Sequence, residues 1–202
     1  MSATGKILTQ GDAQKANLSD GAIAEQSAIA KRSAIATAIH AVRLLLIAMW
    51  LGAALFFSAA VAPSAFAVLA ASRELAGAIV SRTLVIVNIS GFVIGVLLLL
   101  SATLFQAKRK AALRAEMIAL VIVALATGAG QWIIRARLEQ LRVLMKVPVD
   151  AVAANDPLRI AFGQWHVYSV MALGIALLAA FAAFVLMWRS EDKFKKRDGE
   201  NV

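Results

Sequence analysis

Apolar residues gather in four long runs along the 202-residue chain, separated by shorter polar segments. Each run has roughly 18 to 22 residues, or about 27 to 33 Å of α-helix, which matches the hydrocarbon thickness of a bilayer. The pattern therefore predicts an all-α integral membrane protein built as a four-helix bundle. The expected spans cover about residues 44–61, 84–105, 117–134 and 167–188.

Two of these helices are predicted to continue beyond their apolar runs. Apolar residues keep a helical spacing from Ile134 to Met145, so the third helix is expected to run on until Pro148. Asp156 followed by Pro157 is typical of a helix N-cap and first helical position, so the fourth helix is expected to start there. Helices 3 and 4 should therefore extend past the outer membrane face.

The distribution of positive charge predicts the orientation. Of the 21 lysines and arginines, fourteen lie in the two tails and the second loop, and seven lie in the first and third loops. Cytoplasmic loops carry the excess of lysine and arginine, so both termini are expected in the cytoplasm. The net charge of +9 is interpreted through this distribution of lysine and arginine, and no nucleic-acid partner is predicted.

The expected organisation has three parts. Residues 1–39 form a cytoplasmic tail, weakly helical or disordered, because its isoleucines recur every six residues and make no stripe. Residues 40–190 form the four-span domain, and residues 191–202 form a basic cytoplasmic tail. No cleaved secretory signal is expected, and the bacterial inner membrane is the predicted location.

Polar side chains concentrate in the predicted outer halves of the spans, where they are expensive to place. Either they line a polar, hydrated crevice that opens outward, or they hydrogen-bond neighbouring helices and hold the bundle together. The candidate cluster comprises Asn88, Gln131, Arg135, Arg159, His166 and Ser169. Arg159, Phe162, His166 and Ser169 are expected on one helix face.

No metal site and no cofactor are predicted. The two histidines, His40 and His166, lie at opposite ends of spans, about 30 Å apart across the hydrocarbon, and cannot share an ion. Cysteine is absent, which excludes disulfides and thiolate ligands. Two alternatives stay open: a haem- or copper-binding protein that uses His166, and a membrane enzyme with a polar site at the outer face.

The second span contains two glycines at small-xxx-small spacing, Gly91 and Gly95. This spacing lets another helix approach closely, either within the chain or from a second copy.

Three segments of the chain resemble a known family. They read "WLGAALFFSAAVAPSAF" in the first span, "AGAIVSRTL" before the second, and "RIAFGQWHVYS" at the entry to the fourth. Over roughly residues 40–190 they resemble the domain-of-unknown-function 4149 family, grouped with the transmembrane protein 205 proteins. The resemblance implies a four-helix membrane protein without an established activity. It also implies a distant similarity to copper-resistance D-type membrane proteins and to integral-membrane protoporphyrinogen oxidases, which use haem.

The prediction for function is an integral membrane protein of unknown molecular activity. We expect a non-enzymatic membrane partner or transport accessory with an outward-facing polar cluster. Its expected partners are the lipid bilayer and either a second copy of the chain or another membrane protein.

Overall fold

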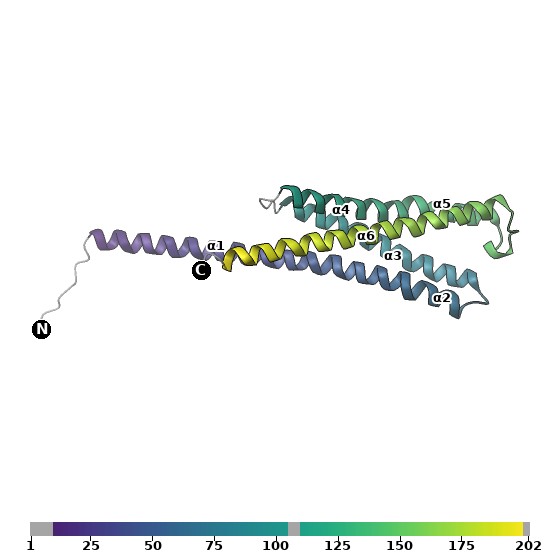
Figure 1. The fold of residues 1–202 in the computed structure, drawn as a ribbon, viewed down its shortest axis with the longest axis horizontal. Coiled ribbons are helices and arrows are strands. Elements are labelled where there is room, and N and C mark those ends of the chain that lie inside the picture. Colours follow the sequence, from purple (N-terminus) through teal and green to yellow (C-terminus); the bar gives the residue numbers. More distant parts are fainter. Residues whose placement is uncertain (1–9, 105–109, 200–202) are drawn as a thin grey trace. The chain divides into compact units, whose positions relative to one another are not determined.

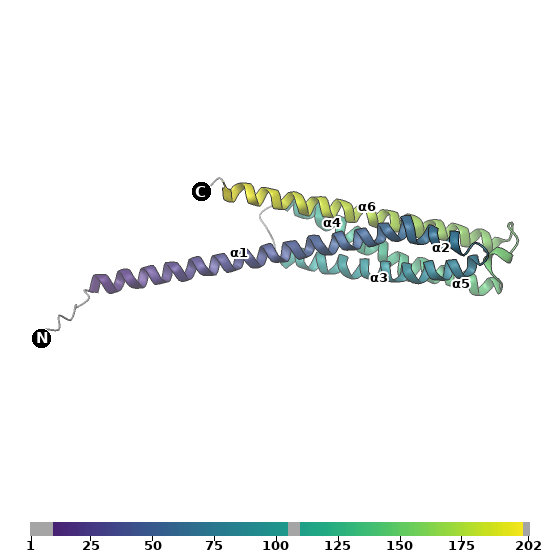
Figure 2. The same ribbon diagram turned by 90° about the horizontal axis from the view of Figure 1, so that it is seen from below.

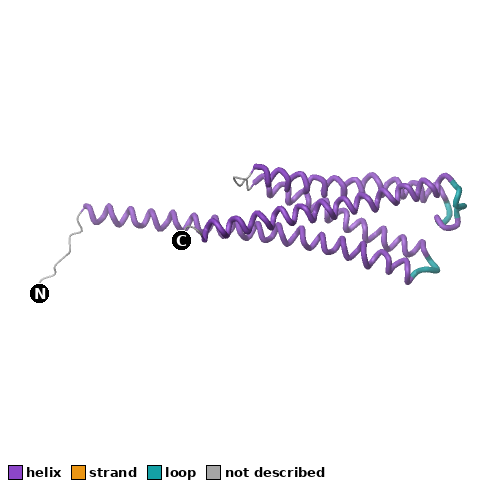
Figure 3. The backbone as a smooth tube through the Cα atoms, in the orientation of Figure 1, coloured by secondary structure: helices purple, strands orange, loops and turns teal. Residues whose placement is uncertain are grey.

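A computed structural model describes residues 10–104 and 110–199 of the protein (Figure 1). The described residues form helices and short connections, without a strand among them (Figure 3). In chain order the elements are α1 (Gln10–Phe56), η1 (Phe57–Val61), α2 (Ala62–Val68), α3 (Arg73–Leu104), α4 (Lys110–Gly128), η2 (Ala129–Ile134), α5 (Arg135–Met145), η3 (Val149–Ala151) and α6 (Pro157–Gly199). Elements η1 and η2 are π-helical, and η3 is a 3₁₀ turn.

The chain divides into two compact units, residues 1–42 and residues 43–202. The described residues of the first unit are helical from Gln10 onward. Its isoleucines Ile23, Ile29 and Ile35 are each about 60% exposed, because a spacing of six residues spreads them around the helix.

Four helical stretches are long and apolar enough to cross a membrane. They cover Glu25–Val68, Arg73–Thr103, Leu113–Met145 and Pro157–Arg189, and they contain the four predicted spans within the described residues. Residue 105, the predicted end of the second span, lies outside those residues. Many large apolar side chains point outward, such as Leu178 with 74% exposure, as expected where the solvent is lipid. The prediction of an all-α chain with four membrane-length helices is confirmed.

The first and second apolar helices are longer than their predicted spans. Helix α3 begins at Arg73, well before the predicted start at residue 84. The first stretch continues past the predicted end at residue 61, through Pro63 to Val68. The π-helical turn η1 leads directly into α2, and Pro63 falls in the first turn of α2. Proline has no backbone N–H, so the continuous helix passes Pro63 with one backbone hydrogen bond fewer.

The connection between α5 and α6 follows the predicted signals at the start of α6, whereas α5 stops short of its expected end at Pro148. Helix α5 ends at Met145, and Lys146 adopts a left-handed conformation with φ of 59°. The Asp156 Oδ1 atom accepts a hydrogen bond of 2.7 Å from the backbone N–H of Leu158, which caps α6. The predicted helix start at Asp156-Pro157 is therefore confirmed. This connection and the α2–α3 loop lie at the same end of the second unit, called here the loop end (Figure 1, Figure 2).

Within the second unit, helix α4 packs mainly against α3 and α6. The face that α6 buries consists largely of alanine, with Ala176, Ala180 and Ala183 fully buried, and it continues to the fully buried Met187. Small side chains let two helices approach closely, and this packs α6 tightly into the bundle.

The α1 helix contributes a narrower buried stripe. Its buried positions alternate in steps of four and three residues, which keeps them on one face of a helix. They are Arg43, Ile47, Trp50 and Ala54, and the same spacing continues to Phe57 at the start of η1. The stripe is apolar except at its first position, where an arginine is buried.

The glycines Gly91 and Gly95 contact residues of the same chain. A Cβ atom at Gly91 would lie 2.6 Å from the ring of Trp50, and one at Gly95 would lie 3.4 Å from Ala124. The Trp50 indole N–H also donates a hydrogen bond of 2.9 Å to the carbonyl oxygen of Val87. The two glycines therefore give α1 and α4 their close approach to α3.

Candidate functional site

A small polar pocket lies in the second unit between α3, the η2–α5 stretch and α6. Its volume is about 30 Å³, enough for one or two water molecules. We call its buried polar residues, Asn88, Gln131 and Ser169, the floor. We call its three charged residues, Arg135, Glu139 and Arg142, the rim.

The π-helical turn η2 delivers Gln131 to the floor. In a π-helix each backbone N–H bonds to the carbonyl oxygen five residues back instead of four, which locally changes the direction of the side chains. Such turns are frequent at functional sites. The neighbouring Gly130 lets Asn88 lie against this turn, since a Cβ at Gly130 would be 3.1 Å from the Asn88 Nδ2 atom. Sequence and local geometry thus bring two amides together from α3 and η2.

The floor holds unused hydrogen-bonding capacity. The Gln131 Oε1 atom is buried and has no hydrogen-bond partner. Within the part of the chain that the structure describes, the side chains of Asn88 and Ser169 make no hydrogen bond either. An amide oxygen left unpaired in a buried site costs about 1 to 3 kcal/mol. The floor is therefore suited to receive a polar group from outside the protein.

Two hydroxyl groups of the spans are satisfied by their own helices. Thr127 is buried and donates to the carbonyl oxygen of Val123 at 2.7 Å, and Ser90 donates to that of Ile86 at 2.7 Å. These hydroxyl groups bond to their own helix, four residues back, and hold no neighbouring helix. The floor amides are different, because the Gln131 Oε1 atom has no partner in its own helix or in a neighbouring one.

The rim is positively charged overall. Arg135 is exposed and forms no ion pair with any described residue. The Arg142 guanidinium lies 3.8 Å from Glu139 and 5.4 Å from the ring centroid of Phe162, a cation–π distance. Two guanidinium groups thus face a single carboxylate at the mouth of the pocket.

The structure gathers four of the six residues of the predicted cluster in this pocket: Asn88, Gln131, Arg135 and Ser169. Arg159 lies elsewhere, with its Nη1 atom donating to the carbonyl oxygen of Val152 at 2.5 Å in the connection before α6. His166 is exposed on α6 and does not line the pocket. Arg159 and His166 were expected on one face of α6 with Ser169, but of these three residues only Ser169 lines the pocket.

No metal-binding arrangement is present in residues 10–104 and 110–199, in the sense of three or more His, Cys, Asp or Glu side chains held together.

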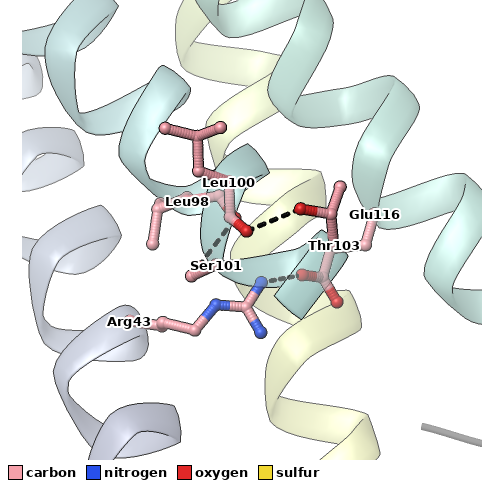
Figure 4. Close-up of polar contacts among 6 residues, drawn as sticks. All are labelled: Arg43, Leu98, Leu100, Ser101, Thr103 and Glu116. Atoms are coloured by element: carbon pink, nitrogen blue, oxygen red, sulfur yellow. Dashed lines mark hydrogen bonds and ion pairs between the residues drawn. The ribbon is translucent and has the colours of Figure 1, made fainter. Parts of the chain in front are cut away.

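A buried ion pair away from the pocket was not predicted. The Arg43 guanidinium of α1 pairs with the Glu116 carboxylate of α4, and the two side chains are only 11% and 9% exposed (Figure 4). Nearby, Ser101 and Thr103 bond to carbonyl oxygens of their own helix (Figure 4). A sequence signal existed, since Arg43 and Glu116 each stand directly before a predicted span and carry opposite charges. The sequence interpretation had counted Arg43 only as a charge of the tail.

Residues 45–146 match the family described as Domain of unknown function (DUF4149). The match covers just over half of the chain and includes Asn88, Gln131 and the whole rim, but not Ser169. No curated protein and no solved structure matches the chain. The similarity to transmembrane protein 205 and to copper-resistance D-type proteins stays a prediction.

Proposed function

The chain belongs to the DUF4149 family, whose description assigns no activity, and we propose from its structure that it acts by binding at the polar pocket. In this proposal it is a multi-pass membrane protein that serves as a membrane partner or transport accessory. The pocket is its recognition site, and the chain does no bond-making chemistry there.

The observation that carries the proposal is the unpaired amide oxygen of Gln131. A buried polar group without a partner is expensive, and polar groups in membrane segments mark binding sites and pathways. A ligand that donates to Gln131 recovers this cost on binding. Asn88 and Ser169 give that ligand further hydrogen-bonding groups, and the rim gives it a charge preference.

We further propose that the loop end faces outward from a bacterial inner membrane, with both termini in the cytoplasm. The support is the distribution of positive charge, fourteen residues against seven. In this orientation the pocket opens toward the outer side, and α5 and the start of α6 extend beyond the outer membrane face.

The absence of cysteine permits a direct test. Ser169→Cys places one thiol on the floor, and Ala183→Cys places one on the fully buried face of the same helix. A membrane-impermeant methanethiosulfonate reagent, added outside intact cells, should modify S169C at least about tenfold faster than A183C, since thiol reaction requires access. Equal rates, or reaction of S169C only after permeabilisation, would contradict the proposal.

A further inference from the structure

The rim of the pocket lies where the third apolar run changes to charged sequence. Arg135 is the first charged residue after Ile134, and it has no ion pair among the described residues. Arg142, two turns further along α5, shares its charge with Glu139 at 3.8 Å. This level of a membrane helix is where phosphate groups of lipids lie, and guanidinium groups bind phosphate through paired N–H donors.

Aromatic residues on α6 mark the same level. Trp165 and Tyr168 contact each other edge to face, with ring centroids 5.6 Å apart, and Tyr168 is exposed next to Ser169 of the floor. Tryptophan and tyrosine are enriched at the headgroup level of membranes because their rings carry a polar end. Residues typical of the lipid headgroup region thus adjoin Ser169 along α6.

The floor restricts the chemistry of the ligand. Gln131 needs a partner that donates a hydrogen bond, whereas two arginines at the rim disfavour a cationic donor such as an ammonium group. A hydroxyl group meets both conditions, and because it both donates and accepts it satisfies either orientation of the amide. The cavity of about 30 Å³ admits a single hydroxyl but not a whole headgroup.

We infer that the pocket binds the headgroup of an anionic phospholipid that carries a free hydroxyl. The phosphate lies on Arg135 and Arg142 at the rim, and the hydroxyl enters the floor and donates to Gln131. This inference rests on the proposed function, since it names the ligand of the same pocket. A free phosphate ion satisfies the rim alone, and it leaves the floor amide without its donor.

The test compares lipids that differ in one group at a time. The full chain is placed in nanodiscs of phosphatidylcholine that contain either phosphatidylglycerol or phosphatidylmethanol, and retained lipids are counted by native mass spectrometry. Both lipids are anionic, but only the first has headgroup hydroxyls. We expect phosphatidylglycerol to be retained over both phosphatidylcholine and phosphatidylmethanol. Gln131→Leu should remove the preference for phosphatidylglycerol over phosphatidylmethanol and keep the preference for phosphatidylglycerol over phosphatidylcholine.

A matched pair of arginine variants tests the rim. Arg137 lies on α5 beside Arg135, is exposed, bonds to Gln140 at 3.2 Å and does not line the pocket. Arg135→Gln should lower retention of phosphatidylglycerol about tenfold, the size of one hydrogen bond to a charged group, and Arg137→Gln should leave it unchanged. Equal losses in R135Q and R137Q would overturn the inference, because they would reveal a nonspecific charge effect.

A further measurement needs no arginine variant. Phosphatidylglycerol in the nanodisc should slow thiol modification of S169C, whereas phosphatidylmethanol and millimolar inorganic phosphate should not. Protection by inorganic phosphate overturns the lipid assignment in favour of a soluble anion. Loss of a copurifying protein in R135Q, without lost lipid, overturns it in favour of a protein partner. If S169C reacts freely and no lipid protects it, the lipid inference fails while the open pocket stands.

Discussion

At the residue scale, Gly91 determines how closely α1 and α3 approach each other. Its missing side chain leaves room for the Trp50 ring, and that position lets the indole N–H reach the carbonyl oxygen of Val87. The small-xxx-small spacing signalled a close approach from sequence, but it left open which helix would come. The partner is a tryptophan 41 positions earlier in the chain, and no local pattern encodes that pairing.

Gly91→Ala should therefore destabilise the protein, whereas Gly163→Ala should not. Both change a helical glycine to alanine, so both gain the same helix propensity. A Cβ at Gly91 meets Trp50 at 2.6 Å, whereas one at Gly163 meets nothing within 4 Å. We expect G91A to lower the free energy of unfolding by about 1 to 3 kcal/mol. Thermal unfolding in detergent, followed by tryptophan fluorescence, measures the difference, and equal midpoints would refute this account of the packing.

The Arg43–Glu116 pair is a second feature at this scale. The two residues are 73 positions apart, so their pairing follows from the tertiary packing of α1 on α4. Each charge is nearly buried, and removal of either leaves the other without its partner. Replacement of both by apolar residues of similar size removes that penalty.

Glu116→Leu and Arg43→Met should each lower the free energy of unfolding by about 3 kcal/mol, because a buried charge is left uncompensated. The double variant R43M/E116L should lose less than either single variant. Unfolding by dodecyl sulfate in mixed micelles provides the measurement. Additive losses in the double variant would show that the two side chains contribute independently.

The polar residues show how far sequence reasoning reaches toward the site. Sorting side chains by depth brought Asn88, Gln131 and Ser169 into one candidate cluster, and the structure places all three on the pocket floor. The same sorting placed His166 in the cluster, on one helix face with Ser169, but His166 is exposed and does not line the pocket. A helix face covers about 100° or more, and sequence alone does not say which edge of it a neighbouring helix covers.

At the scale of elements, the end of a helix was predictable where a side chain close to that end caps it. Asp156 both signals and caps the start of α6, so this boundary was found from sequence. The start of α3 at Arg73 was missed because polar residues there gave no apolar run to follow. The two π-helical turns were also missed, since they arise from packing and leave no periodic signal.

Asp156→Ala should weaken the start of α6 by about 1 kcal/mol, the usual size of an N-cap. Asp156→Asn should retain most of that stability, since an amide oxygen also accepts from the Leu158 N–H. Asp150→Ala is the control: its carboxylate is 56% exposed and 3.8 Å from Arg73, so its loss should be within about 0.5 kcal/mol. Unfolding midpoints of the three variants check the order, and a larger loss in D150A would reverse our assignment.

At the scale of the whole molecule, the described α2–α3 and α5–α6 connections of the second unit lie together at the loop end. The count of spans and the fold class followed from four apolar runs alone. The pairings between helices did not, because lipid-facing and buried positions are equally apolar and periodicity cannot separate them.

Single cysteines should report the orientation of this unit and of the first unit. Ala154→Cys lies in the connection before α6, and Ser33→Cys lies on an exposed position of α1. In intact cells an impermeant thiol reagent should modify A154C, whereas S33C should react only after the membrane is permeabilised. The reverse pattern would place the pocket on the cytoplasmic side.

The alanine face of α6 has a consequence for how the bundle assembles. Alanine has no rotamers to lose on burial, whereas leucine or methionine gives up about 0.5 to 2 kcal/mol of side-chain entropy. Three positions of this face, Ala176, Ala180 and Ala183, are fully buried at no such entropic cost. On this face the entropic cost of burial therefore falls mainly on Met187 and on the side chains of neighbouring helices that meet the alanines.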